Sequence, residues 1–185
     1  MLFRSFSLYA LAVLLRFLLQ WVGADFYNPV SQFIVKVTTP ALKPLRKFIP
    51  GYLGLDLAAL VLTLLIQMLA IAAAALLVGF PLPNVFVLVL WGVIGVAAML
   101  TNIYFFAILA MIIVSWVAPG SGHPAVFLLY RLTEPVMAPF RRILPPIGGL
   151  DLSPILVFVA ISVLQIVLRH MAQSVGLHPA LVPGL

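Results

Sequence analysis

The sequence contains no cysteine, and only four of its 185 residues are acidic. The lack of cysteine excludes disulfide bonds, thiolate metal sites, cysteine nucleophiles and thioether-linked haem. The three histidines are scattered without an HxxxH or HExxH spacing, and no serine has a plausible His and Asp pair in the sequence. We therefore expect no catalytic residues, no metal site and no cofactor, and predict that the protein is not an enzyme.

Charge of either sign is scarce. Charged residues make up 8% of the chain and apolar residues 65%, with a mean hydropathy of +1.27. An ordinary soluble domain is about 45–50% apolar and about 25% charged. The composition therefore predicts an integral membrane protein.

Four apolar stretches approach or exceed the length of about 20 residues that a helix needs to cross a bilayer. They are Leu2 to Val22, Leu57 to Phe80, Val85 to Val117 and Leu152 to Leu168. The third would run about 50 Å as one helix at about 1.5 Å per residue, which is longer than the hydrocarbon core. It must tilt strongly, bend or begin as a separate half-helix, and Gly92, Gly95 and Thr101-Asn102 are the expected place of the change.

The second half of the chain repeats the first at a constant offset of 95 residues, without a gap. Trp21 coincides with Trp116, Pro29 with Pro124, Pro44 with Pro139, Arg46 with Arg141, and residues 54–57 with residues 149–152. We interpret the chain as an internal duplication. Residues 1–80 form the first repeat, residues 81–84 an external turn, and residues 85–185 the second repeat. Because Trp21-Val22 recurs inside the chain, the first stretch is interpreted as a retained helix rather than a signal peptide.

Each repeat would then consist of a span, a polar segment and a second span. Two crossings per repeat give both copies the same orientation, related by a pseudo-two-fold axis along the membrane normal. The predicted fold class is an all-α membrane protein with four transmembrane helices in two tandem parallel repeats. Each repeat has a cytoplasmic amphipathic helix between its spans.

The basic residues predict the orientation. Seven of the ten lie in the polar segments 23–56 and 118–151: Lys36, Lys43, Arg46, Lys47, Arg131, Arg141 and Arg142. The positive-inside rule places both segments in the cytoplasm and both termini outside. Topology and anionic lipid are sufficient to explain the net charge of +6, so nucleic acid is not an expected partner.

A short helix is predicted at the start of each polar segment. Asn28-Pro29 is typical of a helix N-cap and first position, and His123-Pro124 has the same place in the second repeat. Apolar residues follow at helical spacing, and Thr38-Thr39-Pro40 is expected to end the first helix. Such a helix is too short to span the membrane. It either covers the inner mouth of the bundle or lies at the cytoplasmic interface.

A proline-rich segment follows each of these helices, at Pro40–Pro50 and Pro135–Pro145. Each proline fixes φ and removes a hydrogen-bond donor, so we expect a rigid, segmented strut. The strut would hold basic side chains at headgroup depth, where they contact anionic phospholipid or a partner. These residues are Lys43, Arg46, Lys47, Arg141 and Arg142.

Two carboxylates begin the next spans. Asp56 and Asp151 come ten residues after Arg46 and Arg141, which indicates a helix cap bridged to the arginine, with an ion or proton site as the alternative.

Arg16 lies within the first span, at a cost of about 2.5–3.5 kcal/mol if it were at the centre of the bilayer. It either extends to the interface or pairs with Asp25 or Asp56. Arg16 and Asp25 occur in the first repeat only, because the residues at the offset positions are Met111 and Gly120.

Several of these motifs together resemble the YggT family of small multi-pass membrane proteins, called YlmG in some Gram-positive bacteria. They are Leu15-Arg16, Gln20-Trp21, residues 25–29, residues 44–50, residues 54–56, residues 139–145 and residues 148–151. The resemblance covers essentially the whole chain. It implies a link to osmotic tolerance, potassium uptake or cell-division genes in bacteria, and to cytochrome assembly or nucleoid distribution in plastids.

The function we expect is a non-enzymatic accessory or assembly factor linked to envelope or osmotic homeostasis. It would act through anionic phospholipid, an unidentified membrane protein partner or self-association. The alternative is an ion-handling protein, such as a component of a potassium channel or transporter. Few polar residues in the spans are available for that role, chiefly Gln67, Thr101, Asn102 and Gln165.

Overall fold

The computed structural model is all-helical and describes residues 2–52, 54–118, 120–144, 151–178 and 181–182. The helices within these residues are α1 (Leu2–Trp21), α2 (Pro29–Leu45), α3 (Leu57–Val78), α4 (Val85–Val117), α5 (Pro124–Ile143) and α6 (Ser153–Ser174). Each half therefore has an amphipathic helix, α2 or α5, between two apolar helices.

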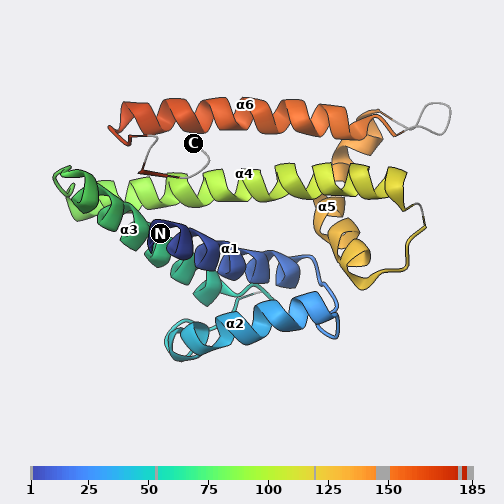
Figure 1. Ribbon diagram of the computed structural model, residues 1–185, viewed down its shortest axis with the longest axis horizontal. Helices are drawn as coiled ribbons and strands as arrows, with labels where there is room; N and C mark the ends of the chain where they lie inside the picture. Colours follow the sequence, from blue (N-terminus) through green and yellow to red (C-terminus); the bar gives the residue numbers. More distant parts are fainter. Residues whose placement is uncertain (1, 53, 119, 145–150, 179–180, 183–185) are drawn as a thin grey trace.

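The most extensive helix pairs are α1 with α3, α3 with α4 and α4 with α6 (Figure 1). In the first half α1 packs against α3, with α2 alongside them; in the second half α4 packs against α6, and α5 crosses near the end of α4. The halves meet where α3 packs on α4 and where the N-termini of α2 and α5 approach each other. At that second junction Asn28 Nδ2 donates to the Pro124 carbonyl at 2.7 Å.

Three helices, α3, α4 and α6, are long and apolar enough to cross a membrane. The apolar stretch of α1 with described side chains, Ser5–Trp21, is shorter. Large apolar side chains project outward along these helices, for example Leu65 and Leu69 on α3 and Val159 and Val163 on α6. An apolar exterior of this extent suits lipid rather than water as the surrounding solvent.

Of the three alternatives for the third apolar stretch, a separate half-helix is wrong, because α4 is one continuous helix from Val85 to Val117. The residues at which the change was expected make interhelical or local contacts. A Cβ atom on Gly92 would lie 2.8 Å from Met68 Cγ, and one on Gly95 would lie 2.5 Å from Gln67 Nε2, so both glycines permit close approach of α3. Thr101 Oγ1 bonds the Ala98 carbonyl, and Asn102 Oδ1 accepts from Gln165 Nε2 of α6 at 3.0 Å.

The predicted stop at Thr38-Thr39-Pro40 is also wrong, and so is the segmented strut. Helix α2 continues to Leu45 through Pro40 and Pro44, and α5 continues to Ile143 through Pro135 and Pro139. The last residue of the second strut, Pro145, lies outside the described residues. All four internal prolines are exposed. The carbonyls that lose a helical donor therefore lie on the outer face, where they can bond water or headgroups at small cost.

Candidate functional site

An ion pair joins the end of α2 to the start of α3. Arg46 is the C-cap residue of α2, and its Nη2 donates to Asp56 Oδ2. Asp56 is the N-cap residue of α3 and accepts from the Ala59 backbone N–H at 3.3 Å. The carboxylate is 4% exposed, whereas the arginine side chain is 39% exposed. Asp56 therefore both caps α3 and holds the loop between the helices.

A second ion pair joins α5 to α6. Arg141 Nε donates to Asp151 Oδ2 at 2.9 Å, and Asp151 Oδ1 accepts from the Ser153 backbone N–H at 2.9 Å. Arg141 has an additional partner, since its Nη1 donates to Glu134 at 2.7 Å. This bridge is more open than the first, with Asp151 33% exposed.

Burial and hydrogen bonding shift the pKa values of Arg141 and Asp151 in opposite directions. Burial favours a higher pKa for Asp151, but hydrogen bonds from Ser153 and Arg141 outweigh it and lower that pKa below its ordinary value. Burial likewise favours a lower pKa for Arg141, but its bonds to Asp151 and Glu134 raise that pKa. Both groups therefore remain charged at neutral pH.

Arg16 is bound to α2 rather than to a carboxylate. Its Nη1 donates to the Val35 carbonyl at 3.1 Å and to the hydroxyls of Thr38 and Thr39, each at 2.9 Å. The residue is only 6% exposed, so it does not extend to the surface. The predicted pairing with Asp25 is wrong, because Asp25 lies in an exposed turn and accepts from the Tyr27 backbone N–H. Asp56 acts on Arg16 through space only.

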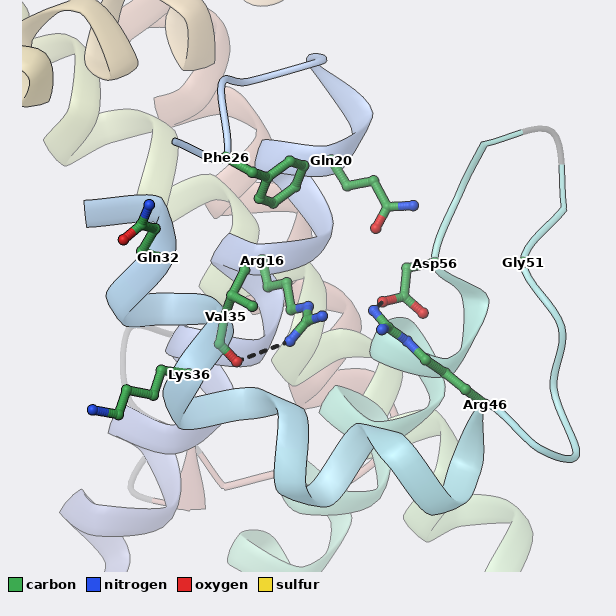
Figure 2. A pocket seen from close by; sticks show the side chains of 9 residues that line it. All are labelled: Arg16, Gln20, Phe26, Gln32, Val35, Lys36, Arg46, Gly51 and Asp56. Atoms are coloured by element: carbon green, nitrogen blue, oxygen red, sulfur yellow. Dashed lines mark hydrogen bonds and ion pairs between the residues drawn. The ribbon is translucent and has the colours of Figure 1, made fainter. Parts of the chain in front are cut away.

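These groups surround a pocket of about 640 Å³, the arginine pocket, drawn in Figure 2. It is lined by Arg16, Gln20, Phe26, Gln32, Val35, Lys36, Arg46, Gly51 and Asp56. Figure 2 shows the Arg16 guanidinium facing the Arg46–Asp56 pair across the pocket. Lys36 lies at the rim, and its ammonium group points away from Arg16. The pocket thus joins α1, α2 and the start of α3.

Comparison with known proteins identifies the family. The chain matches the CCB3/YggT family over residues 1–77 and 90–172. The chain belongs to this family. The matched residues include both ion pairs and the arginine pocket, and leave out the loop between α3 and α4 with the first residues of α4.

Individual members of the CCB3/YggT family are similar over much of the chain. An uncharacterized protein of Pseudomonas aeruginosa is 47% identical over 173 residues, covering 92% of this chain and 88% of that protein. YggT of Escherichia coli is 36% identical over 182 residues, covering 97% of this chain and 92% of that protein. The chloroplast protein CCB3 of Arabidopsis thaliana, whose name refers to cofactor assembly of complex C, is 31% identical over 77 residues. This match covers 40% of this chain and 44% of that protein. No solved structure matches the chain.

The remaining basic residues predicted for the site lie outside the arginine pocket of this CCB3/YggT member. Lys43 and Lys47 near the end of α2 and Arg142 near the end of α5 are exposed. Within the described residues none of them has an ion-pair partner. Likewise, no three His, Asp or Glu side chains of the described part lie together as metal ligands would.

Sequence reasoning missed the partners that Arg16 and Arg141 have on α2 and α5. It did not assign Thr38 and Thr39 as acceptors for Arg16, nor Glu134 as a second partner of Arg141. The offset of 95 residues carried one signal for the contact between Arg16 and Thr38, since it relates Arg16 to Met111 and Thr38 to Thr133. Thr133 Oγ1 lies 3.3 Å from the sulfur of Met111, the residue at the offset position of Arg16.

Proposed function

We propose that this CCB3/YggT member is a non-enzymatic accessory or assembly factor of the bacterial inner membrane. In this proposal α1, α3, α4 and α6 all span the bilayer, in two parallel repeats of residues 1–80 and 85–185. Helices α2 and α5 face the cytoplasm and both termini lie outside. The order of a long helix, an amphipathic helix and a long helix, with an Arg–Asp pair before the last, occurs in both halves and supports this arrangement.

The observation that carries the functional proposal is the exposure of the basic side chains at the C-terminal ends of α2 and α5, which are Lys43, Lys47 and Arg142. Unpaired basic side chains beside a membrane attract anionic phospholipid and acidic partner surfaces. A plastid relative in the same family is named for cofactor assembly, which agrees with action through a partner. We infer that these exposed basic side chains recruit anionic lipid and a membrane protein partner. In this way the protein would support envelope or osmotic homeostasis.

The polar residues within the apolar helices do not favour the ion-handling alternative. Asn102 and Gln165 bond each other, Thr101 bonds its own helix, and Gln67 packs against Gly95. Such contacts are typical of interhelical packing in membranes, where each hydrogen bond contributes about 0.6 kcal/mol on average. We therefore expect no potassium flux in liposomes above that of empty vesicles.

The test compares two sets of substitutions at different depths. Reversing the charge of Lys43, Lys47 and Arg142 to Glu should abolish rescue of whatever osmotic phenotype a deletion strain displays. Arg169→Glu, a charge reversal at the opposite end, is the control and should rescue. Replacing Gln67, Thr101, Asn102 and Gln165 with apolar residues of similar size should also leave rescue intact. Saturable potassium flux that is lost in this quadruple variant would contradict the proposal.

A further inference from the structure

The Arg16 side chain has more hydrogen-bond donors than the described residues accept. A guanidinium carries five N–H groups, and the three bonds to α2 all come from Nη1. Among the described residues none accepts a hydrogen bond from Nε or Nη2. These atoms are also absent from the fully enclosed polar atoms that lack a partner, which are those of Ser31, Gln67 and Tyr104. Three N–H groups of a buried cation therefore remain accessible from the arginine pocket.

The arginine pocket carries an excess of positive charge, since three basic residues, Arg16, Arg46 and Lys36 at the rim, and one carboxylate line it. Asp56 neutralises one guanidinium, that of Arg46, and Arg16 repels Arg46 while being attracted by Asp56. Removing a cation from water is costly unless an anion compensates it. The side-chain amides of Gln20 and Gln32 also line the pocket, so further donors are available to a bound anion.

The corresponding pocket in the second half has no excess of positive charge. It measures about 460 Å³, and its described lining includes Met111, Tyr130, Arg141 and Asp151, so that one arginine stands against one carboxylate. Met111 stands at the offset position of Arg16. Glu134, at the offset position of Thr39, is a second carboxylate bound to Arg141. An excess of positive charge is therefore a property of the first pocket and does not follow from the shared arrangement of helices.

We propose that the arginine pocket binds a phosphate group, held by Arg16 Nε and Nη2 with Arg46 beside it. Arginine suits this role because its planar fork of donors matches two phosphate oxygens. Two sources share this chemistry, the phosphodiester of an anionic phospholipid and soluble phosphate. Arg16 lies five residues from the end of α1, or about 7.5 Å along the helix, which is comparable to the thickness of about 5–7.5 Å of one headgroup layer. The lipid source rests on the proposed membrane orientation, whereas the phosphate site itself does not.

The experiment measures binding of dioctanoyl phosphatidylglycerol to the purified full chain in a neutral detergent by native mass spectrometry. Wild type should retain one lipid tightly, and Arg16→Met, which introduces the residue of the second half, should weaken retention about tenfold or more. Arg169→Met removes one charge elsewhere and should stay within about twofold of wild type. A folded Arg16→Met variant that binds like wild type overturns the proposal.

A second variant transfers the site and does not depend on the stability of Arg16→Met. Met111→Arg with Glu134→Thr gives the second half the residues that stand at positions 16 and 39 and adds a buried guanidinium to its pocket, so the stoichiometry should rise from one tightly held lipid to two. An unchanged stoichiometry in this folded double variant would count against the assignment of Arg16 and its neighbours as the binding groups.

The soluble source is tested with inorganic phosphate, whose binding to the full chain is measured by isothermal titration calorimetry. Binding of phosphate that Arg16→Met abolishes supports a soluble source, and phosphatidylglycerol binding that phosphate does not displace supports a lipid source. Absence of both overturns the phosphate site. The charge reversals at Lys43, Lys47 and Arg142 leave the arginine pocket intact. The proposed function can therefore fail while the phosphate site is confirmed, and the phosphate site can fail while the proposed function is confirmed.

Discussion

At the scale of single residues, the two ion pairs share a spacing of ten residues but differ in their surroundings. Asp56 is enclosed and caps α3 directly, whereas Asp151 lies one residue before the Leu152 cap and is one-third exposed. Arg141 also divides its donors between two carboxylates. Equivalent substitutions in the two halves should therefore have unequal effects, even though the sequence motif is the same.

The lowered pKa of Asp151 predicts a specific pH dependence. Its folded-state pKa lies below the value of about 3.9 expected in the unfolded chain, so the charged form stabilises the fold above that pH. This contribution decreases as the pH falls below about 3.9 and is lost below the folded-state pKa. The melting temperature of Asp151→Asn in detergent should therefore be lower than that of wild type at pH 7. The difference should shrink at pH 3 and disappear at still lower pH.

The Arg141→Gln background is the control for this prediction. It removes one of the groups that lower the pKa of Asp151, so Asp151→Asn should there cause a smaller loss at pH 7. A melting difference between wild type and Asp151→Asn that is constant from pH 7 to pH 2.5 would refute the argument.

The ion pairs were accessible from sequence, but the partners of Arg16 were not. An aspartate at the start of an apolar run indicates a helix cap, and the preceding arginine at the end of a polar segment is its natural counterion. The contacts of Arg16 require α2 to dock on α1 with Val35, Thr38 and Thr39 facing inward. That docking depends on tertiary packing, which local spacing does not specify.

At the scale of helices, prolines misled the sequence analysis. Residues 38–40 predicted the end of a helix, yet α2 continues five residues beyond Pro40. An internal proline costs about 3 kcal/mol or more in a regular helix. Pro40 and Pro44 lie on the exposed face of α2, which reduces that cost. The apolar face of α2 packs on α1 and α3, and this packing offsets the rest. Helix ends were therefore least predictable where packing opposes local preference.

Close packing of α3 on α4 gives a testable consequence at Gly95. An added Cβ atom would lie 2.5 Å from Nε2 and 2.9 Å from Cγ of the buried Gln67, so Gly95→Ala requires that side chain to move. Overpacking of this kind costs about 1–3 kcal/mol, which outweighs the gain in helix propensity of about 1 kcal/mol. Gly95→Ala should lower the melting temperature in detergent.

Removing Gln67 should reverse the sign of this effect. All three nearest atoms belong to Gln67, so in the Gln67→Ala background Gly95→Ala should be neutral or stabilising. The matched control Gly122→Ala adds a Cβ atom with nothing within 4 Å and should leave melting unchanged. Equal destabilisation by Gly95→Ala in both backgrounds would show that Gln67 is not the obstacle.

At the scale of the whole molecule, the sequence predicted the order and type of the helices better than their packing. Composition and apolar run lengths predicted all the long helices, with ends within two residues for α1, α3 and α4 and a six-residue extension for α6. The contact between halves, where α3 meets α4 and Asn28 meets Pro124, was not predicted. Such contacts depend on shape complementarity between distant segments, which an offset match does not encode.

The proposed orientation predicts which side of the membrane each loop occupies, and the cysteine-free chain makes the test direct. Lys47 and Arg142 are exposed and stand at equivalent positions, while the exposed Leu82 lies in the turn between the halves. Single cysteines at positions 47 and 142 should react with a membrane-impermeant maleimide only after the cytoplasmic face is opened, because two crossings separate them. A cysteine at position 82 should react in intact spheroplasts. Labelling of positions 47 and 142 from opposite sides would exclude parallel repeats, since an odd number of spans would then separate α2 from α5.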